Sequence, residues 1–425
     1  MAPDTLAAQP GDAPAKSMAD IEVLGDPKDF YRDLRHQDAL HFDPELNAYL
    51  IARYDDLQTV LGDPVTFSLE QAWDSLWSAE FKAIMDRDGG GFFPDAIMTD
   101  PPTHTRVRKL LEKAFTAQRI KQLEPAITAQ ARSLIEGLAA RGEADGVKDL
   151  AIPVTIRIMA EQLGMTNVDL DTIERWSMAF TAQIGRMLSP EDMAENARIV
   201  CDCQHFVIDM VRQRQQTPSE DLISDLVYAR SEDGEDPVLS FGEIVASTRA
   251  FLIGGNESIS TAMSNMLLML AKQPDLANRL HASLDDDRQF NRFVEELIRI
   301  APPARATSRV VTRDTEIRGQ RIPAGSLVMT MFASANDDEQ QFPDSRRFDL
   351  ERTNLGRQLG FGAGIHKCVG IALARMEVKV VTREVVRQLR DIRLAVPEDQ
   401  LPWRLNVANH ALQSLPLTFT RRAEA

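Results

Sequence analysis

The stretch that decides the fold lies near the carboxyl end, at residues 361–370, and reads Phe-Gly-Ala-Gly-Ile-His-Lys-Cys-Val-Gly. Gly362 and Gly364 permit a tight loop whose backbone can approach a ligand closely, and an amphipathic helix is predicted from Val369 onward. A cysteine at the amino terminus of a helix, as Cys368 is here, has its thiolate stabilised by unpaired N–H groups and by the helix dipole. Such a thiolate readily binds a metal; the alternative for Cys368 is a buried apolar side chain in a glycine-rich turn.

The composition around this loop is that of an acidic globular protein. The 425 residues include 64 Asp and Glu against 48 Lys and Arg, a formal net charge of -16. Nucleic acid is therefore an improbable partner, because phosphate binding needs a basic surface. Three cysteines are too few for a disulfide scaffold, and no apolar run approaches the ~20 residues that cross a bilayer. We expect no membrane anchor and a cytoplasmic location.

The chain is predicted to be mainly α-helical with a minor β part. Residues 1–20, rich in Ala, Pro, Asp and Gly, are expected to form a disordered leader. Residues 21–425 are expected to form a single domain, since no repeat or linker divides them. From the apolar periodicity we predict helices at 54–61, through most of 101–300 and at 368–389, and strands at 46–52, 310–312, 315–317, 327–329 and in the last thirty residues.

Residues 361–370 resemble the haem-binding loop of the cytochrome P-450 family, F-G-x-G-x-H-x-C-x-G, and match every fixed position. The resemblance extends over nearly the whole chain after the leader and is to the soluble bacterial type. It implies the P-450 fold, in which haem b lies between a long distal helix and a proximal loop that bears the cysteine. Cys368 would be the axial thiolate ligand of the haem iron, an arrangement that favours O–O cleavage. The resemblance also implies cofactor contacts by Phe361, Gly362, His366 and Gly370.

Haem has two propionates, which need cationic or hydrogen-bonding partners, and arginine suits carboxylates best. His104 and Arg108 lie four residues apart on a predicted helix and can therefore face the same ligand. Arg309 and His366 match the other propionate contacts of the family. For each residue taken alone, a solvated surface position is the alternative.

A long apolar helix is predicted at about 242–271, yet its centre, 254–258, reads Gly-Gly-Asn-Glu-Ser. Each interior glycine costs about 1 kcal/mol relative to alanine, and such violations of local preference often mark functional sites. The Ser258 hydroxyl can donate to the carbonyl of Gly254, which locally opens the helix. The alternative is a kink or a close helix crossing at the glycines.

In the family this position carries an acid and an alcohol, usually threonine, that relay protons during oxygen activation. Glu257 and Ser258 take these places, with serine where threonine is usual, and the missing side chains of Gly254 and Gly255 would leave room for dioxygen. Serine is less constrained at χ1 than threonine. The resemblance therefore implies a retained but leakier proton relay.

Glu296 and Arg299 form an E-x-x-R pair on a predicted helix. Residues three apart share a helix face, and an isolated exposed pair of this kind contributes only tenths of a kcal/mol. In the family, however, this pair is buried and ties the helix to the irregular segment before the cysteine loop. Arg347 is expected to be the third member of this structural network.

Other features receive structural or weaker functional interpretations. Cys201, Cys203 and His205 lie two apart on a predicted helix and point in different directions, so we interpret them as structural. Segments 301–306 and 407–412 correspond to pocket-lining segments of the family, and Arg305 could anchor a polar group or point to solvent. Six aromatic residues before His104 could face substrate or pack in the core: Phe67, Trp73, Trp77, Phe81, Phe92 and Phe93.

The partners follow from the resemblance and from the charges. A cluster of basic residues is expected on the cysteine side of the haem, formed by Arg106, Lys109, Lys113, Arg346, Arg352, Arg357 and Lys367. On an acidic protein such a cluster favours an acidic docking partner, and the family implies an iron–sulfur ferredoxin with its reductase. The alternative is an ordinary solvated surface. The chain itself is expected to be monomeric.

The predicted activity is that of a monooxygenase that uses O2 and two electrons to hydroxylate a small-to-medium hydrophobic molecule, with aromatic or phenolic, terpenoid and steroid-like substrates all open. The apolar pocket segments favour such a substrate, and the aromatic content before His104 slightly favours aromatics. The alternatives are a haem-thiolate enzyme that uses peroxide or performs a rearrangement, and a non-catalytic haem sensor. Glu257 and Ser258 favour the oxygen-activating form, and no signalling module accompanies the haem region.

Overall fold

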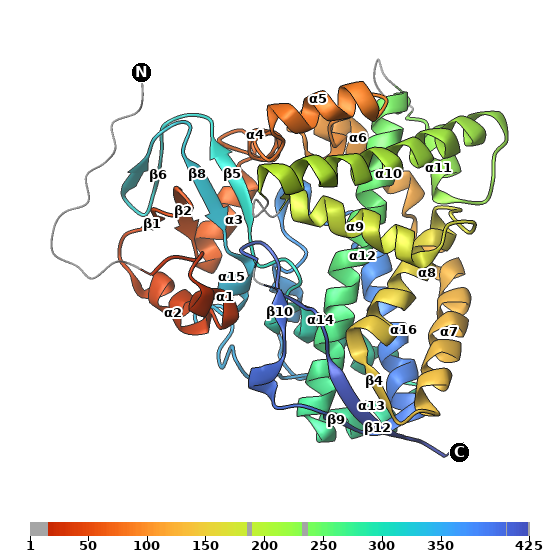
Figure 1. The fold of residues 1–425 in the computed structure, drawn as a ribbon. Helices are drawn as coiled ribbons and strands as arrows, with labels where there is room; N and C mark the ends of the chain where they lie inside the picture. Colours follow the sequence, from red (N-terminus) through yellow and green to blue (C-terminus); the bar gives the residue numbers. More distant parts are fainter. Residues whose placement is uncertain (1–15, 185–188, 232–236, 405, 424–425) are drawn as a thin grey trace.

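The computed structural model describes residues 16–184, 189–231, 237–404 and 406–423, and the fold of these residues is mainly helical with a minor β part, as predicted (Figure 1). The α-helices are α1 (Ile21–Gly25), α2 (Lys28–His36), α3 (Tyr54–Gly62), α4 (Leu69–Asp74), α5 (Ala79–Asp88), α6 (Thr103–Ala114), α7 (Ala117–Ala139), α8 (Ile152–Gln162), α9 (Leu170–Ile184), α10 (Pro190–Gln216), α11 (Leu222–Tyr228), α12 (Phe241–Lys272), α13 (Pro274–Ala282), α14 (Asp287–Ile300), α15 (Phe332–Asn336) and α16 (Ile371–Gln388). The strands are β1 (His41–Asp43), β2 (Ala48–Ile51), β3 (Phe67–Ser68), β4 (Glu143–Asp145), β5 (Thr307–Val311), β6 (Thr315–Ile317), β7 (Gln320–Ile322), β8 (Leu327–Thr330), β9 (Leu389–Leu394), β10 (Trp403–Arg404), β11 (Ala411–Leu412) and β12 (Pro416–Arg421).

The largest sheet joins strands from the amino-terminal part of the chain, residues 41–68, to strands at residues 307–330. Its strand order is β1-β2-β8-β5-β3, with β2 and β8 parallel and the other neighbours antiparallel. Figure 1 shows this sheet on one side of the molecule with α1, α2 and α15 beside it, and the long helices on the other side. A second sheet has the order β4-β12-β9, and β6-β7 and β10-β11 form two hairpins.

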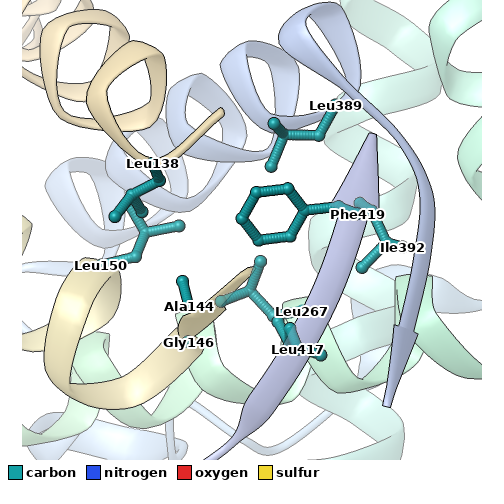
Figure 2. Close-up of a pocket in the computed structure, with 9 residues that line it drawn as sticks. All are labelled: Leu138, Ala144, Gly146, Leu150, Leu267, Leu389, Ile392, Leu417 and Phe419. Atoms are coloured by element: carbon teal, nitrogen blue, oxygen red, sulfur yellow. The ribbon is translucent and has the colours of Figure 1, made fainter. Parts of the chain in front are cut away.

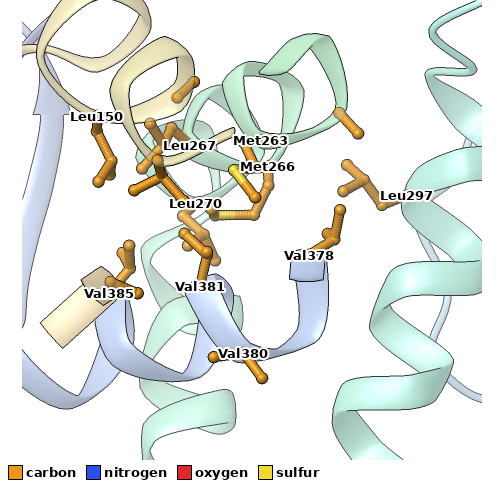
Figure 3. Packing of buried hydrophobic residues seen from close by; sticks show 14 of the residues in the cluster. Leu150, Met263, Met266, Leu267, Leu270, Leu297, Val378, Val380, Val381 and Val385 are labelled. Carbon is orange, nitrogen blue, oxygen red and sulfur yellow. The ribbon is translucent and has the colours of Figure 1, made fainter. Parts of the chain in front are cut away.

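Helix α12 is the centre of the helical part, and its bounds agree with the predicted helix to within a residue at each end. It begins with a capping box, in which the Ser240 hydroxyl accepts from the Glu243 N–H and the Glu243 carboxylate accepts from the Ser240 N–H (2.8 Å). Apolar residues on several faces pack against α8, α9, α10 and α16. Met266 and Leu270 lie in the largest buried cluster with Val381 of α16 (Figure 3). Because most of α12 is buried, departures from apolar sequence within it need a reason.

The amino-terminal residues that the structure describes belong to the packed fold. The Ser17 hydroxyl donates to the Asp43 carboxylate (2.9 Å), as does the Met18 N–H (2.7 Å), and the Met18 side chain is fully buried. The expectation of a disordered segment up to residue 20 is therefore wrong for residues 17 and 18, since Asp43 supplies acceptors that a sequence pattern cannot reveal. Residues 1–15 lie outside the described residues.

A small apolar void lies between α7, α12 and the second sheet, and Figure 2 shows its lining. Its volume is about 10 Å³, and Leu138, Leu267 and Phe419 are among the apolar side chains that surround it. No polar group of this lining could orient a ligand. The void is therefore a packing defect, and the candidate site lies elsewhere.

Candidate functional site at the cysteine loop and the centre of α12

The cysteine loop has the tight backbone that its glycines predict. The Cys368 N–H donates to the Phe361 carbonyl (2.9 Å), which closes the loop over seven residues. Gly362 and Gly364 have φ values of 70° and 67°, in the left-handed region that favours glycine. A side chain at Gly364 would also lie 2.1 Å from the carbonyl oxygen of Leu61, at the end of α3. The loop is therefore fixed against α3 by a contact that only glycine permits.

Cys368 lies three residues before the start of α16, where the helix amino terminus faces it. The surrounding protein raises the pKa of its thiol, while a hydrogen bond from the Gly370 N–H and the charges of Arg108 and Arg375 act in the opposite direction. Arg375 is held in place by Glu295 (2.6 and 2.9 Å) and by the ring of Phe361 (5.2 Å to its centroid). A metal bound here would pair with the thiolate form of Cys368, because the thiolate and not the thiol is the metal-binding form of cysteine.

Four basic side chains gather beside the loop, as the sequence predicts. The rings of His104 and His366 are 4.3 Å apart between centroids, and the Nε2 atom of each is buried without a hydrogen-bond partner among the described residues. Burial, followed by the charges of His104 and Arg309, lowers the pKa of His366 to about 3. Burial also lowers the pKa of Arg309, to about 10. The cluster thus concentrates hydrogen-bond donors and positive charge in a place with little water.

The fourth of these side chains, Arg108, joins α6 to the cysteine loop. Its Nη1 donates to the carbonyl of Lys367 (2.5 Å), and its Nε pairs with Glu112 (2.7 Å), one turn further along α6. Asp100 is the acid whose charge acts on both His104 and Arg309. Its carboxylate is already engaged by the Ser68 hydroxyl and the Leu69 N–H (3.2 Å), and the Nε2 atoms of His104 and His366 are left for another acceptor.

At the centre of α12 the predicted hydrogen bond is present, because the Ser258 hydroxyl donates to the Gly254 carbonyl (2.5 Å). Gly254 and Ser258 are both exposed, in a helix whose other faces are buried, and a side chain at Gly254 would meet no atom within 4 Å. Gly255 differs from the expectation. A side chain there would lie 2.6 Å from the sulfur of Met159 on α8, so Gly255 serves helix packing and Gly254 alone provides open space.

The carboxylate of Glu257 has two partners from other elements. One oxygen accepts from the Thr181 hydroxyl of α9, and the other accepts from Nη1 of Arg404 on β10 (2.9 Å). Neighbouring residues on a helix are about 100° apart, so Glu257 and Ser258 point in different directions. The acid thus faces α9 and β10, while the alcohol faces the open side of α12.

The buried network around Glu296 has a different third member from the one predicted. Arg299 forms a bidentate pair with Glu296 (2.6 and 2.8 Å), and the guanidinium of Arg352 donates to the same carboxylate (3.2 Å). The side chain of Arg347 is exposed, and this residue contributes only its carbonyl oxygen, which accepts from Arg352 (3.1 Å). Because Glu296 and Arg299 are fully buried, the network fixes the segment that leads to the cysteine loop.

Comparison with known proteins places these features in one family. The profile of the family described as "Cytochrome P450" matches residues 89–411, three quarters of the chain, and includes both the cysteine loop and the centre of α12. The chain belongs to the cytochrome P450 family. It is therefore a monooxygenase with a haem-thiolate cofactor, and its reaction uses O2 and an organic substrate.

Relatives of this cytochrome P450 cover nearly its whole length. It is 34% identical to the mycinamicin IV hydroxylase/epoxidase of Micromonospora griseorubida over 88% of this chain and 89% of that protein. It is 33% identical to the steroid C26-monooxygenase of Mycobacterium tuberculosis over 85% of this chain and 91% of that protein. Among solved structures, cytochrome P450 CYP109Q5 from Chondromyces apiculatus has a TM-score of 0.85 at 30% identity and covers 96% of this chain and 99% of that chain.

The residues at the cysteine loop fit the cofactor of the family. Haem presents an iron that accepts a thiolate and two propionates that accept hydrogen bonds. Cys368 offers the sulfur, and the unpartnered Nε2 atoms of His104 and His366, together with buried Arg309, offer donors suited to carboxylates. When bound, haem supplies the electron transfer and oxygen activation that no side chain of this chain could perform.

The other cysteines are structural, as predicted. Cys201 and Cys203 are buried, and the sulfur of Cys201 lies 3.7 Å from that of Met85. Burial raises the pKa of Cys203 to about 12, which keeps it a neutral thiol. Within the described residues, no group of three or more His, Cys, Asp or Glu is arranged to hold a metal ion, and every helix is too short or too polar to span a bilayer.

The aromatic residues before His104 are mostly core residues. Trp77 stacks on Phe81 with ring centroids 5.1 Å apart, and both are buried in one cluster with residues of α9 and α10. Phe67 belongs to β3 of the largest sheet and is buried there. The sequence could not distinguish pocket from core here, because both environments select the same side chains. The slight preference for an aromatic substrate that these residues gave is therefore unsupported.

Arg305 does not take one of its two expected positions, because it is 2% exposed and does not point to solvent. Its Nη1 donates to the carbonyl of Leu24 at the end of α1 (2.8 Å), while its Nη2 is buried without a hydrogen-bond partner among the described residues, so the second expectation, a polar anchor, stays open. Its backbone N–H donates to the carbonyl of Ala408 (2.6 Å), and Ala304 forms an isolated bridge with Asn409. The two predicted pocket segments, 301–306 and 407–412, are thus adjacent.

Three polar residues that join the site elements were not singled out from the sequence, and a fourth, Arg352, was assigned only to the basic surface cluster. Thr181 and Arg404 hold Glu257, Arg352 completes the network of Glu296, and Arg249 of α12 pairs with Asp95 before α6 (2.9 Å). Only Arg249 had a visible signal, namely a cation within an otherwise apolar stretch of helix. Arg352 and Arg404 are ordinary polar residues in segments without helical periodicity, and Thr181 is an ordinary polar residue within the predicted helical region.

Proposed function

We propose that Cys368 is the axial ligand of the haem iron and that this cytochrome P450 hydroxylates a hydrophobic organic molecule with electrons from a ferredoxin. The observation that carries the proposal is the tight loop around Cys368 next to the unpartnered donors of His104 and His366. In this proposal Phe361, Gly362 and Gly370 shape the cradle beneath the porphyrin. His104, Arg108, Arg309 and His366 hold its propionates.

The part of the proposal that concerns oxygen activation and proton delivery rests on α12. The open face at Gly254 would leave room for dioxygen, and the Ser258 hydroxyl, which now donates to the Gly254 carbonyl, could turn to donate a proton on that face. Glu257 is the acid that resupplies the proton. Serine supplies the same hydroxyl as threonine, with a less restricted χ1 angle.

For the substrate we propose an apolar molecule of terpenoid or steroid size. The pocket segments 301–306 and 407–412 are mainly apolar, and the buried Arg305, whose Nη2 has no hydrogen-bond partner among the described residues, adds one polar anchor. The relative from M. tuberculosis is named for a steroid, which supports this size class. The aromatic residues before His104 do not support an aromatic or phenolic substrate, because they are mostly core residues.

The role of Ser258 is tested by comparing Ser258→Ala with the wild type in the presence of ferredoxin, reductase and a substrate that the wild type oxidises. The amounts of product and of peroxide per reduced nicotinamide consumed are measured. We expect the product ratio of Ser258→Ala to fall severalfold and peroxide to rise, because the hydroxyl donor is lost. Ser258→Thr, which keeps a hydroxyl, should equal or exceed the wild type. Unchanged coupling in Ser258→Ala would remove Ser258 from the relay.

A further inference from the structure

Arg404 connects the substrate side of the molecule to the acid of α12. Its Nη1 lies 2.9 Å from Oε1 of Glu257, and it is the only guanidinium among the described residues that pairs with this carboxylate. The Thr181 hydroxyl donates to Oε2, so each carboxylate oxygen is held by a different element. A charge-assisted hydrogen bond combined with a second, neutral one restricts a carboxylate to a narrow range of orientations.

The strand that carries Arg404 is itself firmly placed. Trp403 and Arg404 pair with Leu412 and Ala411 in the β10–β11 hairpin, and the ring of Trp403 stacks on that of His410 with centroids 3.8 Å apart. The hairpin then contacts segment 301–306 through the hydrogen bond between Arg305 and Ala408. Arg404 is therefore fixed to the two segments that line the proposed pocket, and not to a free surface loop.

The partners of the Glu257 carboxylate differ in their exposure. The side chain of Arg404 is 34% exposed and that of Glu257 is 18% exposed, whereas Thr181 is buried. Glu174 of α9 also lies near Arg404, whose charge acts on its carboxylate. The Arg404 end of Glu257 is therefore its accessible end, while Ser258 faces the open side of α12 in another direction. Glu257 thus joins the partly exposed Arg404 to the turn of α12 that carries Ser258.

We propose that Arg404 is a positioning residue for proton delivery: it fixes the orientation of the Glu257 carboxylate, the acid next to Ser258 in sequence, and makes that orientation depend on the wall of the substrate pocket. The inference rests on the proposed relay function of Glu257 and Ser258. Arg404 itself exchanges no proton with oxygen and touches no reacting atom. A carboxylate that loses this partner samples orientations from which Ser258 is not resupplied, so electrons are diverted to peroxide.

The test measures the product ratio and the solvent deuterium isotope effect on turnover for Arg404→Leu, Arg404→Lys, Glu257→Gln and the double variant Glu257→Gln/Arg404→Leu. We expect Arg404→Leu to lower the product ratio severalfold and to raise the isotope effect, with substrate Kd from Soret titration within about twofold of wild type. Arg404→Lys should restore most of the ratio, because it keeps a cation at this position. Arg393→Leu, which removes an exposed arginine from β9, is the control and should behave as wild type.

The double variant separates positioning from a general structural role. If Arg404 acts through Glu257, then Glu257→Gln/Arg404→Leu should be no worse than Glu257→Gln alone, whereas independent effects would add. Additive losses, or a wild-type isotope effect in Arg404→Leu, would overturn the inference. If Glu257→Gln forms as much product per reduced nicotinamide as the wild type, the proposed relay itself is refuted. That outcome is distinct from a result that refutes only the role of Arg404.

Discussion

At the scale of single residues, the most unusual group outside the site is Glu377 in α16. It is fully buried, and neither carboxylate oxygen has a hydrogen-bond partner among the described residues. Burial raises its pKa to about 8 from the ordinary value of 4.5. Glu377 is thus a neutral acid at pH 7, nine residues after Cys368 on the helix that begins beneath the proposed haem site. An ionised carboxylate without a partner would be far more costly in this position.

This burial makes stability depend on pH. The raised native pKa means that the folded chain keeps a proton that the unfolded chain loses, so stability from this group is full below about pH 4.5 and declines as pH rises towards 8. The decline is at most about 1.4 kcal/mol per pH unit. Glu377→Gln should reduce this slope, as measured by urea unfolding at pH 5.5, 6.5 and 7.5. Exposed Glu80→Gln is the control, and parallel profiles for Glu377→Gln and wild type would refute the assignment.

At the scale of elements, Arg249 joins α12 to the segment that precedes α6 and to two long helices. Its guanidinium donates to Asp95 (2.9 Å), to the carbonyl of Phe93 (2.9 Å) and to Gln204 of α10 (2.6 Å). It also lies 5.1 Å from the ring centroid of Phe180 on α9. Since Arg249 is one turn before Gly254, this network holds the half of α12 that leads to the open face.

Removing the cation should therefore destabilise several elements together. Arg249→Met leaves the buried Asp95 carboxylate without its cation, with the indole N–H of Trp73 (3.0 Å) still donating to it, and we expect a loss of about 3–5 kcal/mol in the free energy of unfolding. The double variant Arg249→Met/Asp95→Asn, which removes both charges, should lose less than the sum of the single variants. Arg198→Met, in an exposed ion pair on α10, provides the comparison and should cost below about 1 kcal/mol. Equal losses for Arg249 and Arg198 would contradict the network's importance.

At the scale of the whole molecule, the basic surface near the cysteine loop is smaller than the sequence predicts. Arg106 pairs with Glu243, Arg346 pairs with Asp29 and Asp337, and Arg352 is buried with Glu296. The four remaining members of the predicted cluster are exposed: Lys109, Lys113, Arg357 and Lys367. Two of them adjoin the hydrogen bond between Arg108 and Lys367 that connects α6 with the loop. A ferredoxin that docks at this face would bring its cluster close to Cys368.

Charge reversal at this face tests the docking. We expect Lys109→Glu/Lys367→Glu to raise the ferredoxin concentration for half-maximal reduction about tenfold at low ionic strength, because steering by unlike charges is lost. The difference should shrink as salt is added. Arg393→Glu on β9 is the matched control. Reduction that depends on neither salt nor these lysines would show that the partner binds elsewhere.

The features that could be predicted from the sequence are set by residue spacing within one helix. Contacts between residues that lie far apart in the sequence could not be predicted. Helix α12, the hydrogen bond from Ser258 to Gly254 and the pairing of Glu296 with Arg299 all follow from spacing along one helix. Arg347 and Arg352 lie in a segment without periodicity, and only the folded chain shows which guanidinium reaches Glu296. Gly255 likewise meets Met159, a residue about a hundred positions earlier, and no pattern within α12 predicts that contact.

The central claim is that Cys368 is the thiolate ligand of the haem, and the Soret band of the reduced carbon monoxide complex tests it most directly. We predict that the wild type shows the long-wavelength band typical of thiolate ligation. Cys368→His should move the band to the shorter wavelength of a nitrogen ligand, and Cys201→Ser should leave it unchanged. A haem-loaded wild type without the long-wavelength band, or a Cys368→His variant that keeps it, would contradict the account.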